Sequence, residues 1–80
     1  MPLQVAVDRE DLQRALGAMD SLPDRQRGVL YLHTCEGLSL ADIATVLEIS
    51  NGAVKTNLSL ARKRMRELLA DIVTERFPNG

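Results

Sequence analysis

The stretch from Ser50 to Ile72, SNGAVKTNLSLARKRMRELLADI, constrains the fold most, because its apolar residues recur with helical spacing. Alternating steps of four and three residues place them on one side of an α-helix. The apolar stripe consists of Val54, Leu58, Ala61, Met65, Leu68 and Ile72. The opposite side carries small residues first and cations later: Gly52, Thr56, Ser59, Lys63 and Arg66. Such a side is either a solvated surface or one that enters a DNA groove and then meets phosphate.

Composition limits the chain to a small aliphatic domain. Eighty residues form one domain at most, and an apolar fraction of 45% is enough for a compact core. The only aromatic residues are Tyr31 and Phe77, which disfavours proteins that stack single-stranded bases on aromatic side chains. The net charge of −1 does not by itself indicate nucleic-acid binding. However, five cations and no acid lie between Lys55 and Arg66, and a cationic segment of this kind can form a local phosphate-binding surface on an otherwise acidic domain.

Several other classes of protein are disfavoured by what the sequence lacks. Cys35 has no disulfide partner, and with His33 it does not close a metal site, so we expect neither a metal nor a cofactor. We expect Cys35 to be a small buried or half-buried apolar residue. Ser39 and Ser50 have no base arranged for them, so we interpret them as helix caps and expect no enzyme. The absence of a membrane-length apolar run and of a signal peptide favours a cytoplasmic protein.

Cap and stop signals predict an all-α fold of four helices. We expect helices at 8–19, from about 21 to a stop at Gly37, at 39–48, and from 50 to before residue 77. Asp8, Ser39 and Ser50 are the expected N-caps, and Pro23 suits a first helical position. The inner face of the first helix is expected to hold Leu12, Ala15, Leu16 and Met19. The domain would cover 8–76, between a flexible N-terminus at 1–7 and a tail at 77–80.

The third and fourth helices are joined by Glu48, Ile49 and Ser50 alone. A connection this short favours two helices that cross steeply, as in a helix-turn-helix. Ala44 is small where the helices must pack closely, and Ile49 and Val54 can fill the space at the turn. These residues fit a helix-turn-helix and also a plain helical hairpin.

Five motifs along the chain carry a more specific signal. They are Leu22-Pro23-x-Arg25-Gln26-Arg27, Glu36-Gly37-Leu38-Ser39, Asp42-Ile43-Ala44, Ile49-Ser50-x-Gly52-x-Val54-Lys55 and Ala61-Arg62-x-Arg64-x-Arg66-x-Leu68. In this order, over about residues 20–69, they strongly resemble region 4 of sigma-70-family RNA polymerase sigma factors, of the extracytoplasmic-function (ECF) type. The resemblance implies a four-helix helix-turn-helix fold without a wing.

The resemblance also implies partners and site residues. In the family this domain binds the −35 promoter element in the DNA major groove and docks on the β-flap of the RNA polymerase core, and many members are held by an anti-sigma factor. By position, the implied DNA-binding residues are Asn51, Gly52, Lys55, Thr56, Asn57, Ser59, Leu60 and Lys63. The implied phosphate contacts are Arg25, Arg27, Arg62, Arg64 and Arg66.

The chain departs from the family pattern at three positions. Asn57 and Leu60 stand where a basic residue is common, and Glu48 stands where the turn often has glycine. Leu60 can touch a thymine methyl but cannot make the paired hydrogen bonds of arginine to guanine, worth about 1–3 kcal/mol each. If the turn needs a positive φ, Glu48 costs on the order of 1 kcal/mol relative to glycine.

Two alternatives remain open on the sequence. One is a sigma-like protein-interaction module that binds an anti-sigma factor or the polymerase flap without reading DNA, favoured by Asn57, Leu60 and the acidic total. The other is the output domain of a LuxR-type response regulator, whose pattern overlaps residues 38–55. The 80 residues include no domain for the −10 element. We therefore expect the chain to be part of a longer sigma factor or an accessory protein.

Overall fold

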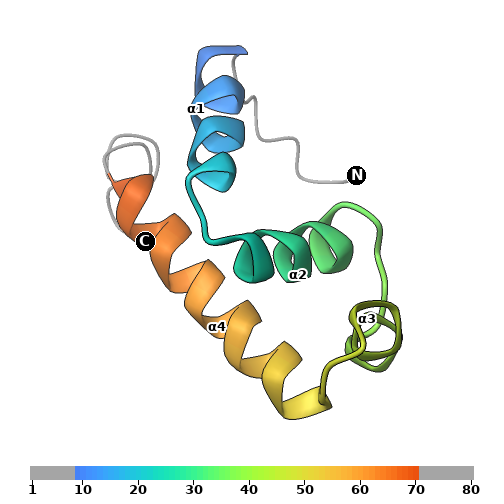
Figure 1. Ribbon diagram of the computed structural model, residues 1–80. Helices are drawn as coiled ribbons and strands as arrows, with labels where there is room; N and C mark the ends of the chain where they lie inside the picture. The colour runs from blue at the N-terminus through green and yellow to red at the C-terminus, as the bar shows by residue number, and fades with distance from the viewer. Residues whose placement is uncertain (1–8, 71–80) are drawn as a thin grey trace, which may run out of the picture.

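Four helices make up the described part of the computed structural model, residues 9–70. In chain order they are α1 (Arg9–Asp20), α2 (Asp24–Thr34), α3 (Leu40–Leu47) and α4 (Asn51–Leu68), as Figure 1 shows. No strand occurs between residues 9 and 70, and the expected all-α fold is confirmed. Among these helices, none is both long and apolar enough to cross a membrane.

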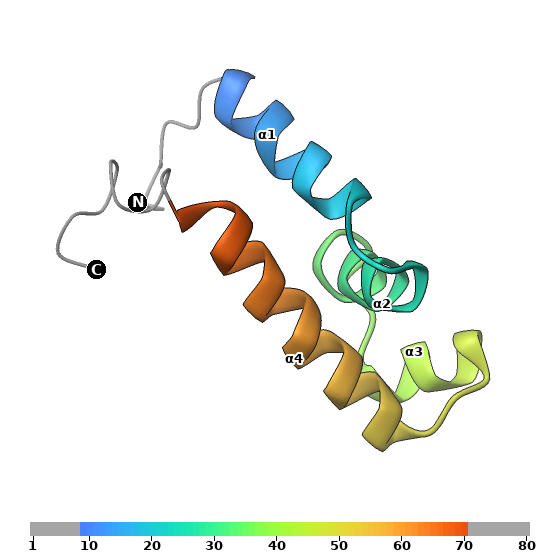
Figure 2. The same cartoon turned by 60° about the vertical axis from the view of Figure 1, so that its left-hand side comes forward.

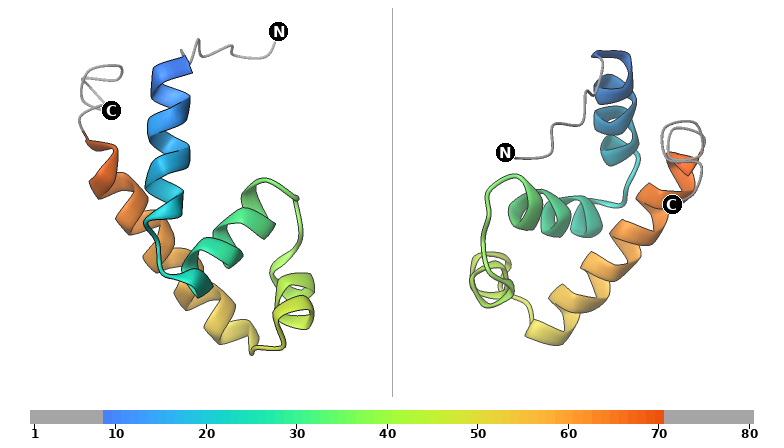
Figure 3. Two further views of the ribbon diagram at one scale, coloured as in Figure 1. Left: turned by 45° about the horizontal axis from the view of Figure 1, so that its top comes forward. Right: turned by 180° about the vertical axis from the view of Figure 1, so that it is seen from behind.

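The other three helices pack against α4 (Figure 2). The N-terminal turns of α4 lie beside α3, and its C-terminal half lies beside α1, with α2 between them (Figure 3). The apolar stripe of α4 faces this assembly, as its spacing predicted. The core is entirely aliphatic and contains Leu22, Val29, Leu30, Ile43, Ala44, Val54, Leu58 and Ala61.

The three largest of the completely buried side chains are Val29 from α2, Ile43 from α3 and Val54 from α4. Burying a side chain of this size stabilises the fold by about 1.5–3 kcal/mol. Because each comes from a different helix, this burial fixes how α3 and α4 cross and holds both against α2.

Serine caps begin both helices of the crossing pair, as expected. The Ser39 hydroxyl oxygen accepts the backbone N–H of Asp42 at 3.1 Å, and the Ser50 hydroxyl oxygen accepts that of Ala53 at 3.0 Å. Each cap satisfies an N–H group that has no partner within its own helix. The start of α4 is therefore set by a specific interaction, which fixes where its exposed side begins.

The turn between α3 and α4 contains a residue in the left-handed region. Glu48 has φ 57° and ψ 47°, and the backbone N–H of Ile49 donates to the carbonyl oxygen of Ala44 at 3.0 Å. This geometry is a Schellman motif, whose left-handed position usually holds glycine. Glu48 therefore has the positive φ that the sequence analysis considered for this position, where the family often has glycine.

Helix ends differ from the expected ones at several places. Pro23 is the cap that precedes α2 and not its first helical residue. The same helix stops at Thr34, three residues before Gly37, which has a φ of 71°. The fourth helix ends at Leu68, because Leu69 leaves helical geometry. The expected Asp8 cap, the last stripe residue Ile72 and the expected continuation of α4 toward residue 77 lie outside the described residues.

The expected inner face of α1 was wrong for two of its four members. Leu12 and Leu16 are 52% and 53% exposed, whereas Ala15 and Met19 are half-buried. Within the described part of the chain, α1 has no buried residue, because it lies along one edge of α4 and leaves its remaining surface open. Cys35 is exposed as well, contrary to expectation, because it follows the end of α2 and is not packed into the core.

Candidate nucleic-acid interface

One side of α4 is uncovered by the other described helices. Its exposed residues begin with Asn51 and Gly52 in the first turn and continue along the helix. Because the buried stripe faces the core, this side points away from the body of the domain (Figure 2). Seven of the eight predicted DNA-binding residues are exposed here: Asn51, Gly52, Lys55, Thr56, Ser59, Leu60 and Lys63.

A cationic flank borders this exposed side toward α3. A hollow of about 420 Å³ is lined by Leu40 of α3 and by Lys55, Leu58, Ser59, Arg62 and Arg66 of α4. Among the described residues, no carboxylate forms an ion pair with Lys55, Arg62 or Arg66. Three cations without acidic partners along one edge form a surface suited to the phosphates of a DNA strand.

The flank toward α2 is mixed in character. A hollow of about 310 Å³ is lined by Pro23 and Gln26 of α2 and by Leu60, Lys63, Arg64 and Glu67 of α4. The Arg64 Nη1 and Glu67 Oε2 atoms are 3.5 Å apart, and both side chains are about half exposed. An exposed pair of this kind contributes at most about 1 kcal/mol, so Arg64 can exchange its partner for phosphate at little cost.

Asn57 is the one predicted DNA-binding residue that is not exposed. Its side chain is half-buried, and its Nδ2 atom donates a hydrogen bond to the backbone carbonyl of Ala53 at 2.8 Å. The amide group is therefore turned back onto α4 itself. A short polar side chain within a helix often makes such a local bond, which the sequence pattern does not reveal.

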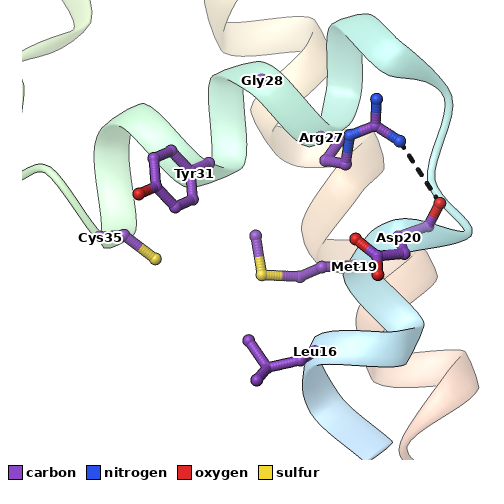
Figure 4. A pocket seen from close by; sticks show the side chains of 7 residues that line it. All are labelled: Leu16, Met19, Asp20, Arg27, Gly28, Tyr31 and Cys35. Carbon is purple, nitrogen blue, oxygen red and sulfur yellow. Dashed lines mark hydrogen bonds between the residues drawn. The ribbon is translucent and has the colours of Figure 1, made fainter. Parts of the chain in front are cut away.

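The two predicted phosphate contacts on α2, Arg25 and Arg27, differ in exposure and in their partners within the domain. Arg25 is exposed. Arg27 is not: its Nη2 atom lies 2.8 Å from Asp24 Oδ1, and its Nη1 atom donates to the carbonyl oxygen of Asp20 at 3.4 Å (Figure 4). The second bond ties α2 to the end of α1, so both terminal nitrogens of Arg27 have partners within the domain.

An apolar groove between α1 and α2 was missed on the sequence. It has a volume of about 510 Å³, and Leu16, Met19, Tyr31 and Cys35 line it, with Gly28 on the α2 side (Figure 4). A hydrogen bond with Glu36 and the charge of that carboxylate raise the pKa of Tyr31, which is exposed at the groove. The groove could have been suspected from the apolar residues of α1, Leu16 and Met19 among them. The sequence analysis instead expected these residues to pack into the core.

The crossing of α3 and α4 through a three-residue connection defines the class of protein. Ile43 and Val54 are buried where the helices cross, and the second helix of the pair exposes its N-terminal turns. This is the arrangement of a helix-turn-helix domain, in which the second helix is the one that reads DNA. The plain helical hairpin left open on the sequence is thereby excluded.

Comparison with known proteins gives the family. The family model for sigma-70, region 4 matches residues 12–65, and this chain belongs to that family. It is 38% identical over 71 residues to the RNA polymerase sigma factor FliA of Escherichia coli K12, covering 89% of this chain and 30% of that protein. Over 51 residues it is 39% identical to the ECF RNA polymerase sigma factor SigW of Bacillus subtilis, covering 64% of this chain and 27% of that protein.

A third relative extends the same result. The probable RNA polymerase sigma factor RfaY of Xanthomonas campestris is 35% identical over 68 residues, which cover 85% of this chain and 17% of that protein. The expected sigma-70 region 4 family is therefore confirmed, with relatives that include an ECF factor and FliA. The chain spans less than a third of the length of these relatives.

Proposed function

We propose that this chain is the DNA-binding domain of an RNA polymerase sigma factor and recognises the −35 promoter element in transcription initiation. The observation that carries the proposal is the exposed side of α4 in a domain of the sigma-70 region 4 family. It is bordered by Lys55, Arg62 and Arg66, which form no ion pair with an acid between residues 9 and 70. Acting on chromosomal DNA, the protein would work in the cytoplasm. The proposal gives the chain no catalytic role.

The geometry supports a specific docking mode. In helix-turn-helix domains the N-terminal residues of the second helix contact base edges in the major groove. Here those residues are Asn51, Gly52 and Thr56, all exposed. Lys55 and Arg62 lie beside them on the flank, where the phosphates of the groove wall would be. Base contacts would then set the sequence preference, and phosphate contacts would supply most of the affinity.

The RNA polymerase core is the proposed protein partner, through its β-flap. The relatives are named RNA polymerase sigma factors, and the apolar groove between α1 and α2 is a surface that a protein helix could fill. An exposed apolar surface of this kind is typical of a protein contact. An anti-sigma factor would compete for the polymerase-binding or DNA-binding surface.

Binding of this chain to a promoter-like duplex across a salt series tests the proposed function. We expect affinity to fall steeply as salt rises, because each phosphate contact contributes about 0.9 to the slope of log affinity against log salt. Replacing Arg62 with alanine should reduce that slope by about one contact. The matched control is Arg9→Ala, which removes an exposed cation from α1.

Two results would contradict the proposed function. One is the absence of duplex binding above background even at low salt. The other is equal loss of slope in the Arg62 and Arg9 variants, because binding would then follow net charge and not the surface of α4.

A further inference from the structure

One side of α1 is apolar and is not covered by the other described helices. Leu12, Leu16 and Met19 are spaced by four and three residues, so they lie on the same side of this helix. Leu12 and Leu16 are 52% and 53% exposed. Leu16 and Met19 also form the α1 wall of the apolar groove, opposite Tyr31 of α2 (Figure 4). An exposed apolar side that adjoins a groove is typical of a contact surface.

Two other helices of the chain begin with a pair of apolar residues five positions apart. The first member precedes the N-cap, and the second is the fourth helical residue. In α3 the pair is Leu38 and Ile43, and in α4 it is Ile49 and Val54. Ile43 and Val54 are completely buried, and Leu38 and Ile49 pack against the same core. Such a pair is a hydrophobic staple, which holds the chain that enters a helix against the first turns of that helix.

The same pair occurs in the sequence at the start of α1. This helix begins at Arg9, so Leu12 is its fourth residue and Asp8 is at the N-cap position. Aspartate is among the preferred N-cap residues. The residue before it is Val7. The pattern therefore predicts that Val7 packs on Leu12 and turns the preceding residues back along α1.

The residues before Val7 match the exposed side of α1 in spacing and in chemistry. Leu3, Val5 and Val7 alternate with other residues, so an extended segment places all three on one side. Alternate residues of an extended chain are about 6.6 Å apart, and residues four apart along a helix are about 6 Å apart. With Val7 on Leu12, Val5 therefore lies beside Leu16. Leu3 then reaches the mouth of the groove.

We propose that residues 3–7 form a strap that runs back along α1 and covers Leu12, Leu16 and the mouth of the groove between α1 and α2. This strap takes the place of the flexible N-terminus expected from the sequence. A protein partner that fills the groove has to displace it, so the strap lowers the apparent affinity for that partner. The strap itself is independent of the proposed function, whereas the competition rests on the polymerase contact proposed there.

Methyl NMR of the 80-residue chain tests the strap in the absence of any partner. We expect nuclear Overhauser contacts between the methyl groups of Val7 and Leu12 and between those of Val5 and Leu16. Val5→Asp should shift the Leu16 methyl signals and weaken the contact between Val7 and Leu12. The matched control is Gln4→Asp, which adds the same charge at the neighbouring position, on the other side of the extended segment. It should leave both signals unchanged.

Capture of the same variants by RNA polymerase core tests the competition. A strap that is in place for about nine-tenths of the time lowers the apparent affinity of a competing partner about tenfold. We therefore expect Val5→Asp to strengthen capture severalfold and Gln4→Asp to leave it unchanged.

The possible failures separate this inference from the proposed function. Absence of both methyl contacts in the unsubstituted chain, or equal shifts of Leu16 in the two variants, would overturn the strap. Methyl contacts together with unchanged capture of the Val5 variant would overturn the competition. Methyl contacts without capture of any variant would overturn the proposed polymerase contact and leave the strap standing.

Discussion

Glu48 shows how one residue affects the geometry on which the interface depends. It holds φ 57° in the turn that aims α4, and its backbone N–H approaches the carbonyl oxygens of Ala44 and Thr45. A residue with a Cβ atom is strained in this region, and its carboxylate has no role in the turn's backbone bonds. The backbone hydrogen bonds of the turn and the burial of Ile43 and Val54 therefore offset the strain at Glu48.

Replacing Glu48 with glycine should therefore stabilise the domain. We expect a gain of about 1 kcal/mol in the free energy of unfolding, because glycine adopts a positive φ without steric cost. For a domain of this size that gain raises the melting temperature by roughly 4–8 °C. The control is Glu48→Ala, which removes the carboxylate but keeps the Cβ atom and should gain little. Equal stabilisation by both variants would show that charge, not backbone strain, is the cause.

At the scale of elements, the sequence predicted the buried side of α4 correctly but not that of α1. The stripe of α4 predicted its buried side because the other three helices pack on that side. The apolar face of α1 predicted burial of Leu12 and Leu16 that does not occur. Periodicity reveals which side of a helix is apolar, but it does not reveal whether a neighbouring helix of the same chain covers that side. The uncovered side of α1 instead forms the groove with Tyr31.

A charged residue in the α1 groove should separate stability from partner binding. Leu16 is 53% exposed, so Leu16→Asp removes little buried area and should change the free energy of unfolding by less than about 1 kcal/mol. The same substitution should weaken capture of this chain by RNA polymerase core, because the groove would present a charge to an apolar surface. Duplex binding by the isolated variant serves as the control and should be unchanged. Undiminished capture would exclude this groove as the polymerase contact.

For the whole molecule, the sequence predicted the fold more fully than the interface. The two serine caps, the all-α class, the helix-turn-helix and the sigma region 4 family follow from local patterns and motif order. Arg27 is held by the Asp20 carbonyl and the Asp24 carboxylate, whereas Arg25 is exposed, and the Asn57 amide is held by the Ala53 carbonyl. These local partners compete with DNA for the Arg27 and Asn57 side chains. Whether a side chain reaches such a partner depends on its orientation, which residue spacing does not specify.

Mapping the DNA contact on the whole domain by NMR tests the central claim most directly. The backbone amide spectrum of the 80-residue chain would be followed as a promoter-like duplex is added at low salt. We predict that the shifted amides concentrate in α4 between Asn51 and Lys63, with the groove formed by Leu16 and Tyr31 unaffected. Shifts centred on that groove, or no shifts on α4, would contradict the account of α4 as the DNA-reading helix.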